Sequence, residues 1–341
     1  MEKTLNISVI GSGSWGTALA ILLAENNHNV KLWSRSPEKR AELERSKENK
    51  QYLPGARIPD AVIHVDDISA CADGDIIVCA IPSIAVRSVM ELYAPFARKG
   101  QKILSVSKGL EYEKLITLSA VIREVLPDCD VSAMSGPSHA EEVARKMPTA
   151  NVVASASQNT AEFIQSAFMS SYFRVYTNPD IIGVELGGAL KNVIALCAGI
   201  SDGLGFGDNA KAALMTRGIY EITRLGVAMG ADAETFGGLS GIGDLIVTCT
   251  SVHSRNLRAG RLIGKGLTAE QARQEVKMVV EGIYTCRAAK ALADKMNVEM
   301  PIVNQAYAIL FEDKPAIDAT WSLMGRDRRN ESEAGFLTPY A

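Results

Sequence analysis

A glycine-rich turn near the N-terminus carries residues whose types and spacing suit the binding of a phosphate-bearing ligand. Residues 6–10 read as a strand and run directly into Gly11, Gly13 and Gly16 of a G-x-G-x-x-G pattern that opens the helical stretch 17–24. In that context the first glycine permits a tight turn, the second lets the backbone approach a pyrophosphate, and the third lets the helix pack on the sheet. The helix N-terminus then faces the anion. The turn predicts a dinucleotide site, with a purely structural glycine turn as the alternative.

Arg35 follows the second predicted strand, residues 30–33. Sites of this type that prefer NAD usually carry an acidic residue there, which accepts a hydrogen bond from the ribose 2′-hydroxyl. The acidic residue is missing here, and a guanidinium near its place would pair with a 2′-phosphate through two hydrogen bonds and stack on adenine. Arg35 therefore predicts a preference for NADPH over NADH, and a solvated loop arginine is the alternative.

An apolar helical stretch that begins near residue 185 carries a single lysine, Lys191. When successive residues are projected about 100° apart, the small and polar residues of this stretch fall within an arc of about 120°. They are Glu185, Gly188, Lys191, Asn192, Ala195, Gly199 and Asp202. Such a stripe is typical of a cleft wall, and partial burial would lower the pKa of Lys191 toward the working pH, as a general acid/base requires. A lysine whose ammonium reaches solvent at a domain interface is the alternative.

Later in the chain, Asp244, Arg255 and Asn256 suit the recognition of a small phosphorylated molecule. Asp244 follows two glycines, and its carboxylate can orient a lysine or accept from a substrate hydroxyl. A turn-forming or helix-capping aspartate is the alternative. Arg255 and Asn256 offer planar hydrogen-bond donors that match a phosphate.

Lys108 follows the predicted strand 103–106 and so lies at the carboxyl-terminal edge of a sheet, where open α/β proteins bind ligands. An ordinary loop lysine is the alternative. Ser138, two residues after Gly136, matches the capping pattern S-x-x-E with Glu141, so helix capping competes there with ligand binding. Both roles are compatible, because a capped helix N-terminus still presents free N–H groups.

These residues belong to a chain of 341 residues, a length that suggests two domains at about 150 residues each. Short β-branched runs alternate with helical stretches up to about residue 180, the pattern of a parallel sheet built from βαβ units. The predicted strands are 6–10, 30–33, 76–80, 103–106, 131–134, 151–154 and 173–176. Beyond Pro179 the sequence reads as long Ala/Leu/Gly-rich helices. We therefore expect a Rossmann-type, mostly parallel sheet domain over residues 1–179, followed by an all-α domain over residues 180–341.

The overall composition excludes several classes of protein. Hydrophobic residues make up 47% of the chain, and 36 Lys and Arg against 39 Asp and Glu leave a net charge of −3, which favours neither nucleic acid nor an anionic membrane as partner. The six cysteines form no C-x-x-C pair, so neither a metal site nor a disulfide framework is expected. No run of 18 apolar residues occurs. We expect a cytoplasmic protein without membrane insertion.

Six motifs, taken together and in chain order, resemble the bacterial-type, NAD(P)-dependent glycerol-3-phosphate dehydrogenase family. They are G-x-G-x-W-G at residues 11–16, Ser-Lys-Gly at 107–109, Gly-Pro-Ser-His-Ala at 136–140, Leu-Lys-Asn at 190–192, Gly-Asp-Leu at 243–245 and Ser-Arg-Asn at 254–256. The resemblance covers nearly the whole chain. It implies the reversible reduction of dihydroxyacetone phosphate to sn-glycerol 3-phosphate by NADH or NADPH, in support of phospholipid synthesis, and a homodimer.

The resemblance also implies roles for individual residues, with Lys191 as the proton donor and acceptor. The implied substrate contacts are Lys108, Gly136, Ser138, Lys191, Asp244, Ser254, Arg255 and Asn256. The implied cofactor contacts, beside the glycine turn, are Ser14, Trp15, Arg35, Lys108, Ala140, Arg255, Val279 and Glu281. Glu281 is also explained as an acid near a helix start, where the helix dipole favours it.

Two other functions remain open from the sequence. A Rossmann dehydrogenase of the β-hydroxyacid or 6-phosphogluconate type also uses a lysine followed by asparagine, although the Ser-Arg-Asn motif favours a phosphorylated triose over a carboxylate. A non-catalytic NADPH-binding protein is the second alternative, and it would not need Lys191.

Overall fold

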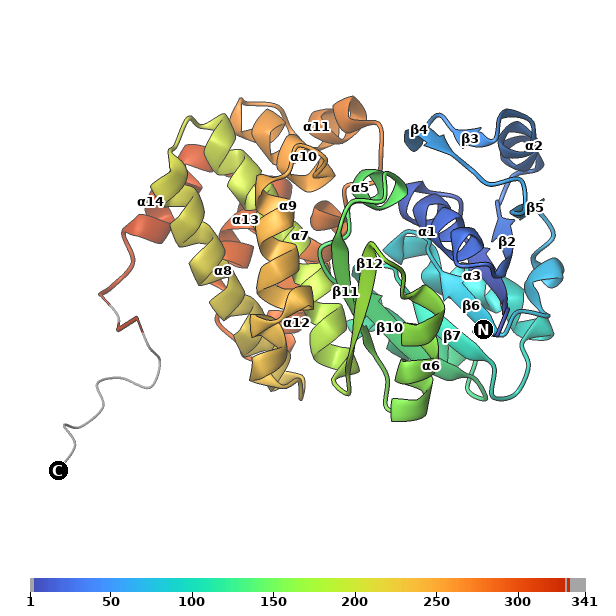
Figure 1. Cartoon of the computed structure of the whole chain (residues 1–341). Helices are drawn as coiled ribbons and strands as arrows, with labels where there is room; N and C mark the ends of the chain where they lie inside the picture. The colour runs from blue at the N-terminus through green and yellow to red at the C-terminus, as the bar shows by residue number, and fades with distance from the viewer. Residues whose placement is uncertain (1–2, 329, 332–341) are drawn as a thin grey trace.

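The structure is a computed structural model that describes residues 3–328, 330 and 331. A sheet covered by helices occupies the N-terminal half, and helices alone occupy the C-terminal half (Figure 1). The expected α/β sheet followed by an α-helical region is therefore confirmed.

The central sheet has eight strands in the order β12-β11-β10-β7-β6-β1-β2-β5. Their bounds are β1 Asn6–Ile10, β2 Asn29–Trp33, β5 Ile63–Val65, β6 Ile76–Cys79, β7 Lys102–Ser105, β10 Asp130–Ser135, β11 Thr149–Ala154 and β12 Phe173–Asn178. Every neighbouring pair is parallel except β10 and β11. All seven predicted strands are present within two residues at each end. The strand of the central sheet that sequence reasoning missed, β5, is only three residues long, and its apolar side chain Ile63 is exposed.

Two short hairpins complete the β-structure. They pair β3 (Glu48–Asn49) with β4 (Leu53–Arg57), and β8 (Leu110–Glu111) with β9 (Ile116–Thr117).

Helices cover both faces of the central sheet. Successive side chains of a strand point to opposite faces, so neighbouring residues of one strand pack against different helices. Val9 packs in the cluster that includes α1 (Ser14–Glu25) and α6 (Gln158–Phe168). The next residue, Ile10, packs in the cluster that includes α3 (Val86–Tyr93) and α4 (Leu118–Val125). This double burial explains the nearly continuous apolar runs of the strands. The short helices α2 (Pro37–Ser46) and α5 (Ala140–Ala144) add Leu43, Ala140 and Val143 to the cluster that includes α1.

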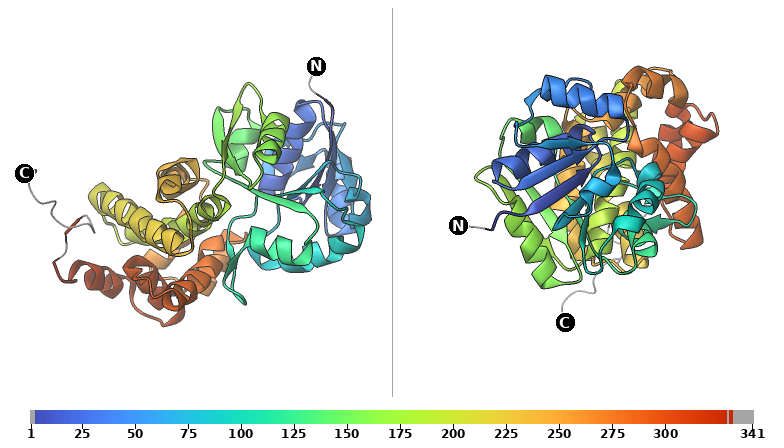
Figure 2. Two further views of the ribbon diagram at one scale, coloured as in Figure 1. Left: turned by 90° about the horizontal axis from the view of Figure 1, so that it is seen from below. Right: turned by 90° about the vertical axis from the view of Figure 1, so that its right-hand side faces the viewer.

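The helical half is built around α7 (Ile181–Gly203), which contacts α8, α9, α10, α12 and α13 and also strands β10 and β11. The remaining helices are α8 Asp208–Ala228, α9 Asp244–Thr250, α10 Arg255–Gly264, α11 Ala269–Val276, α12 Glu281–Lys295, α13 Pro301–Phe311 and α14 Ala316–Met324. The view from below in Figure 2 shows these helices to one side of the sheet. The last strand ends at Asn178 and α7 begins at Ile181, on either side of the proposed domain boundary.

Glycines bring α7 and α10 unusually close together. A Cβ atom on Gly199 would lie 2.2 Å from the carbonyl oxygen of Leu257, and one on Gly260 would lie 2.1 Å from the carbonyl oxygen of Leu196. Any larger residue at either position would push the helices apart. This contact fixes the start of α10, which carries Arg255 and Asn256, relative to the helix that carries Lys191.

Among the described residues, α7 is the helix that is long and apolar enough to cross a membrane, but 89% of its most apolar window is buried inside the protein. Its hydropathy is therefore explained by its place in the core.

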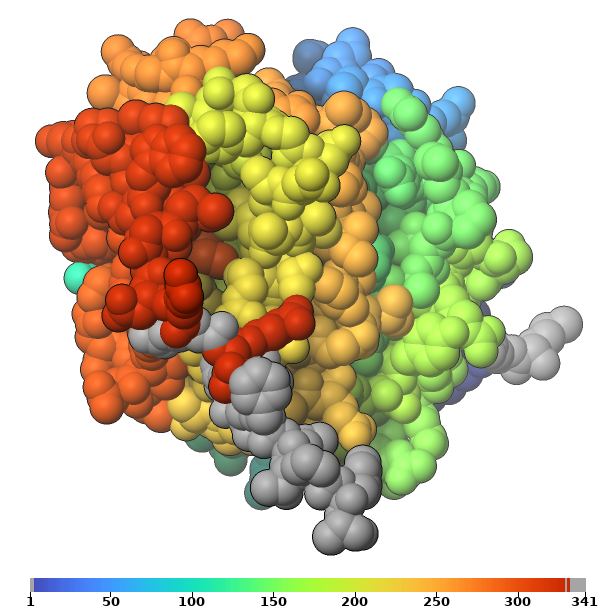
Figure 3. Space-filling view, turned by 90° about the vertical axis from the view of Figure 1, so that its left-hand side faces the viewer, coloured from blue at the N-terminus to red at the C-terminus, as the bar shows by residue number. Residues whose placement is uncertain are grey.

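A groove of about 1130 Å³ lies between α8, α13 and α14, away from the residues singled out by the sequence. Leu214, Glu221, Ala306 and Leu323 are among its lining residues. Figure 3 shows this face, with α8 in yellow beside α14 in red.

Candidate active site

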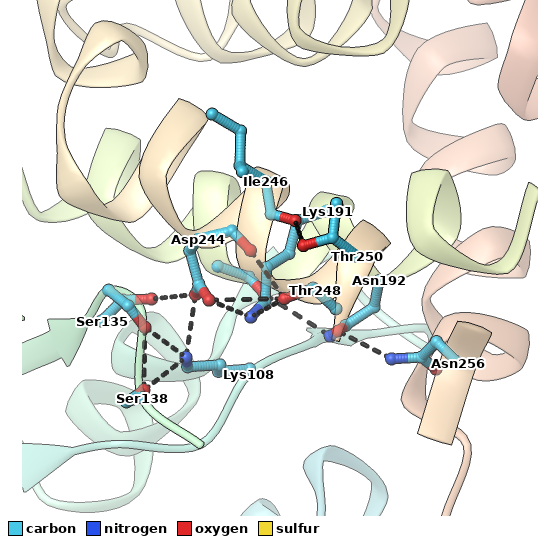
Figure 4. Close-up of polar contacts among 12 residues, drawn as sticks. Lys108, Ser135, Ser138, Lys191, Asn192, Asp244, Ile246, Thr248, Thr250 and Asn256 are labelled. Atoms are coloured by element: carbon cyan, nitrogen blue, oxygen red, sulfur yellow. Dashed lines mark hydrogen bonds and ion pairs between the residues drawn. The ribbon is translucent and has the colours of Figure 1, made fainter. Parts of the chain in front are cut away.

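Asp244 joins two lysines that come from different halves of the chain (Figure 4). Its Oδ2 atom lies 2.8 Å from the Nζ atom of Lys108, which follows β7, and its Oδ1 atom accepts a hydrogen bond from the Nζ atom of Lys191 on α7. Asp244 is 1% exposed and Lys191 6% exposed, so the ion pair is shielded from bulk water. Three residues that sequence reasoning singled out separately thus form one cluster, which we call the lysine–aspartate cluster.

The backbone before α9 places Asp244 over α7. Residues Leu239–Gly243 form a π-helical segment that leads directly into α9. A Cβ atom on Gly187 would lie 2.5 Å from the carbonyl oxygen of Ser240, and one on Gly241 would lie 2.0 Å from that of Phe236. Glycine at these two positions lets the segment lie flat against α7, which brings the carboxylate within reach of Lys191.

Burial and charge act in opposite directions on the two buried partners. Burial opposes ionisation of Asp244, but the charges of Lys108 and Lys191 outweigh it and hold the pKa of Asp244 below its usual value. Burial lowers the pKa of Lys191 to about 7; Asp244 counteracts this shift and Lys108 adds to it. The amine of Lys191 can therefore gain or lose a proton near neutral pH, which a general acid/base requires.

Sequence reasoning missed two hydroxyl groups in this cluster. Lys191 Nζ donates to Thr248 Oγ1 at 2.8 Å, and Thr248 Oγ1 donates to the carbonyl oxygen of Asp244 at 2.6 Å. Ser135 Oγ lies 3.5 Å from Asp244 Oδ2. The spacing of Asp244 and Thr248, one turn apart on a short helix, was a signal that could have identified the threonine.

Lys108 also holds the loop that follows β10. Its Nζ atom donates to the carbonyl oxygen of Gly136 and to Ser138 Oγ, each at 3.1 Å. Helix capping by Ser138 with Glu141, which the sequence left open beside ligand binding, does not occur. The N-cap of α5 is His139, which makes no side-chain cap, and Ser138 Oγ instead donates to the carbonyl oxygen of Gly136 at 2.8 Å. Ala140 begins α5 and is buried.

The predicted cleft wall on α7 is correct for only part of the stripe. Gly188 faces the lysine–aspartate cluster, because a Cβ atom there would lie 2.3 Å from Ser135 Oγ. Glu185 is instead a buried link to the sheet domain, and it accepts hydrogen bonds from the N–H and Oγ of Ser119 at 2.8 and 2.5 Å. Asp202, at the far end, forms ion pairs with Lys211 and Arg261. Helical periodicity placed these residues on one face but did not identify what covers each of them.

The start of α10 meets α7 beside Lys191. Asn256 Nδ2 donates to Asn192 Oδ1 at 2.8 Å, and Asn256 Oδ1 accepts from the backbone N–H of Gly282 at 2.9 Å. Ser254 Oγ accepts from the N–H of Leu257 at 3.2 Å and caps α10. Arg255, the first residue of α10, forms no ion pair within residues 3–328, 330 and 331. Burial lowers the pKa of Arg255, whereas Glu281 and Glu141 counteract this shift.

The glycine turn has the geometry that its pattern predicts. Gly11 has φ +119°, and a Cβ atom there would lie 2.4 Å from the carbonyl oxygen of Ala80. A Cβ atom on Gly16 would lie 1.9 Å from the carbonyl oxygen of Gly11, whereas the space around Gly13 is open. Gly13 is the N-cap of α1 and provides no side-chain cap. The turn therefore has room for a pyrophosphate next to the first N–H groups of the helix, which fits a dinucleotide cofactor.

The remaining predicted cofactor residues are spread around this turn. Ser14 and Trp15 begin α1 and are half-buried. Arg35 is exposed directly after Ser34, whose hydroxyl donates to Ser12 Oγ of the turn at 2.8 Å. Val279 lies two residues before α12 and is half-buried, and Glu281, the first residue of α12, accepts hydrogen bonds from Ser83 after β6.

The described side chains offer neither a metal site nor a disulfide bond. Within the described part of the chain, no three His, Cys, Asp or Glu residues are grouped so that they could hold a metal ion. All six cysteines are free thiols.

Comparison with known proteins identifies two matching family regions. Residues 6–161 match the NAD-dependent glycerol-3-phosphate dehydrogenase N-terminus, and residues 180–320 match the NAD-dependent glycerol-3-phosphate dehydrogenase C-terminus. Together they cover most of the chain.

Individual proteins are similar over nearly their whole length. The curated glycerol-3-phosphate dehydrogenases (NAD(P)+) of Agathobacter rectalis and Moorella thermoacetica are each 53% identical to the chain, over 95% and 97% of it and over 97% and 98% of their own lengths. The crystal structure of glycerol-3-phosphate dehydrogenase from Coxiella burnetii superposes with a TM-score of 0.92 at 38% identity, covering 95% of this chain and 99% of that one.

Proposed function

Because the chain belongs to the NAD-dependent glycerol-3-phosphate dehydrogenase family, we propose that it interconverts dihydroxyacetone phosphate and sn-glycerol 3-phosphate with NADH or NADPH. The product supplies phospholipid synthesis. The lysine–aspartate cluster carries the proposal, since it holds a buried amine with a pKa near neutrality between two halves of the molecule.

When bound, a reduced nicotinamide supplies the hydride that the carbonyl carbon accepts. Protonated Lys191 donates its proton to the carbonyl oxygen as negative charge develops there, so that an alcohol forms. Asp244 keeps Lys191 oriented and balances its charge, and the ammonium of Lys108, 2.8 Å from the same carboxylate, places a second positive charge beside the reacting oxygen. In the reverse direction neutral Lys191 accepts the hydroxyl proton.

Arg255 is the proposed anchor of the substrate phosphate. It is half-buried at the N-terminus of α10, a place where a helix attracts anions, and no ion pair occupies its guanidinium within the described residues. Asn256, which uses one of its two amide hydrogens to bind Asn192, retains the other for the same phosphate. Binding of the phosphate there fixes the carbonyl relative to Lys191 and so makes orientation part of catalysis.

The glycine turn and the residues around it constitute the proposed cofactor site. Gly11, Gly13 and Gly16 would hold the pyrophosphate, and Arg35 beside them would pair with a 2′-phosphate. The preference for NADPH rests on Arg35 and on the absence of an acidic residue after β2. The Michaelis constants of NADPH and NADH, measured side by side with the same substrate, test it, and a clear preference for NADH would refute it.

Oxidation of NADPH followed optically separates the three candidate functions. Dihydroxyacetone phosphate should be reduced, whereas a panel of ketones that carry a carboxylate in place of the phosphate should react poorly. Reduction of a carboxylate ketone would favour a β-hydroxyacid or 6-phosphogluconate type of enzyme. Cofactor binding without turnover of any ketone would favour a non-catalytic NADPH-binding protein.

Three further properties belong to the proposal. They are a division into domains of residues 1–179 and 180–341, a homodimer, and a cytoplasmic location. The homodimer is tested by light scattering after gel filtration, where a mass near 36.6 kDa would show a monomer instead.

A further inference from the structure

Ser83 and Glu281 join the two halves of the molecule at a second point, apart from Asp244. Ser83 follows β6 in the sheet domain and is 5% exposed, and Glu281 is the first residue of α12. The Oε1 atom of Glu281 accepts from the N–H of Ser83 at 3.1 Å, and its Oε2 atom accepts from Ser83 Oγ at 2.6 Å. We call this pair the Ser83–Glu281 clasp. Both carboxylate oxygens are thus bound to protein groups.

The clasp touches the segment that carries Lys108. A Cβ atom on Gly109 would lie 2.5 Å from Ser83 Cβ and 3.4 Å from Glu281 Oε2. The backbone next to Lys108 therefore packs directly against both members of the clasp. Ser83 also lies two residues after Ile81, which contacts Gly11 of the glycine turn: a Cβ atom on Gly11 would lie 2.8 Å from Ile81 Cγ2. One serine thus connects the cofactor side and Lys108 with α12.

On its other side the clasp leads to the phosphate-binding segment and to α7. Gly282, the neighbour of Glu281, donates its N–H to Asn256 Oδ1 at 2.9 Å, and Asn256 Nδ2 donates to Asn192 Oδ1 at 2.8 Å. A Cβ atom on Gly282 would lie 2.6 Å from the carbonyl oxygen of Asn192. The start of α12 therefore packs between Ser83 on one side and Asn192, the residue next to Lys191, on the other.

We infer that Ser83 is a positioning residue for the proposed reaction. Through the clasp it holds the start of α12, and with it Asn256 and Asn192, in register with the glycine turn and Lys108. Burial raises the pKa of Glu281, with Ser83 counteracting it, so the two hydrogen bonds from Ser83 compensate a carboxyl group that is costly to bury. Glu281 then acts through Ser83 to align the two halves, and the acceptor sites of its carboxylate that Ser83 does not use remain available to the cofactor. The inference rests on the proposed function for its kinetic consequence but not for the clasp itself.

Ser83→Ala tests the inference, because it removes the hydroxyl and leaves the backbone bond. We expect kcat/KM for dihydroxyacetone phosphate to fall about tenfold to hundredfold, as for a small misplacement of reacting groups, while the dissociation constant of NADPH changes less than about twofold. The primary isotope effect with deuterated cofactor should increase, because hydride transfer becomes slower. Ser88→Ala is the matched control: Ser88 is an exposed serine on α3 whose Oγ donates only to the carbonyl oxygen of Ala85, and its activity should match that of the wild type.

Changes at Glu281 provide the second arm of the test. Glu281→Ala should resemble Ser83→Ala, and the double variant should be no worse than Glu281→Ala, since both changes break one interaction. Glu281→Gln should retain most of the activity, because its amide can accept from the N–H of Ser83 and donate to Ser83 Oγ. Wild-type kcat/KM in Ser83→Ala would overturn the inference, and weakened NADPH binding in Glu281→Ala and Glu281→Gln would then assign Glu281 to the cofactor alone.

Hydrogen exchange of the Gly282 amide distinguishes failure of the clasp from failure of the proposed function, because it needs no substrate. The clasp predicts faster exchange at Gly282 in Ser83→Ala and not in Ser88→Ala. Unchanged exchange would overturn the clasp whatever the activity. Faster exchange in a protein that reduces no ketone would support the clasp and refute the proposed function.

Discussion

Two buried carboxyl groups of the helical half, Asp244 and Glu221, have pKa values that are shifted in opposite directions. They are 1% and 3% exposed. Asp244 lies between two ammonium groups, whose charges outweigh its burial and lower its pKa. Glu221 on α8 accepts hydrogen bonds from the N–H groups of Ile302 and Val303 at 2.8 and 3.3 Å, and burial raises its pKa to about 7.

The comparison shows that burial alone does not determine the charge of a carboxylate. Two lysine charges at hydrogen-bond distance overcome the desolvation of Asp244. For Glu221, the two N–H groups at the start of α13 and the smaller effects of Arg224 and Arg326 do not overcome it. Asp244 remains an anion that sets the protonation and direction of Lys191. Glu221 fixes the end of a helix, and it lines the groove between α8, α13 and α14.

Removal of the amine should have the largest effect. Lys191→Ala should lower kcat by about 10²- to 10⁴-fold, because the proton donor is lost, while cofactor affinity stays nearly intact. Steady-state kinetics and cofactor titration measure the two effects. Lys290→Ala is a suitable control, since Lys290 also pairs with an aspartate, Asp294, but on the partly exposed face of α12. Retained turnover in Lys191→Ala would remove Lys191 from the proposed role.

Asp244→Asn should lower kcat/KM by about tenfold to hundredfold, because the two lysines then lack their counter-charge. The pKa of Lys191 should also fall below its wild-type value, since Asp244 raises it. The measurement is the pH profile of kcat/KM in both proteins. The same carboxylate-to-amide change in Glu221→Gln should leave the profile as it is. Identical profiles for wild type and Asp244→Asn would show that Asp244 does not control Lys191.

The pH dependence of the two reaction directions should be opposite. Reduction requires protonated Lys191, so kcat/KM should fall about tenfold per pH unit above the pKa of about 7. Oxidation requires the neutral amine, so its kcat/KM should rise up to pH 7 and then level off. Parallel profiles in the two directions would show that another group carries the proton.

Glu221→Gln should have the smallest effect, confined to stability. The folded-state pKa of about 7 lies above the ordinary value of 4.5, so the folded state binds the proton more tightly. This contribution to stability is fully present below pH 4.5 and is lost as the pH rises through 7. The amide does not titrate, so the Tm of Glu221→Gln minus that of the wild type should increase between pH 5 and pH 7.5. Thermal unfolding at both pH values measures it, and a constant difference would contradict the raised pKa.

Residues that act through their own backbone were predictable from the sequence. The glycine turn is one, because Gly16 packs directly on the carbonyl oxygen of Gly11, five residues before it in the chain. The seven predicted strands of the central sheet are another, because their β-branched and apolar runs are typical of strands that are buried on one or both faces. The three-residue β5 lacked that signal, since its apolar residue Ile63 is exposed.

Residues that act through distant partners were only partly predictable. Lys108, Lys191 and Asp244 were each singled out, but nothing in their spacing showed that one carboxylate joins both amines. Ser138 matched a capping pattern and yet bonds to Lys108, because an ammonium within reach competes with the local helix end. Ser83 carried no signal, since its partner is 198 residues away.

The sequence by itself determined the order of strands and helices, the conformation of the glycine turn and the types of side chain available for chemistry, because these depend on local sterics and on hydrophobic periodicity. Only the tertiary structure decided which charges meet, which of them are buried and hence which pKa values shift. Coulomb interactions and desolvation depend on distance and surroundings in space, and the chain brings Lys108, Lys191 and Asp244 together from segments that lie up to 136 residues apart.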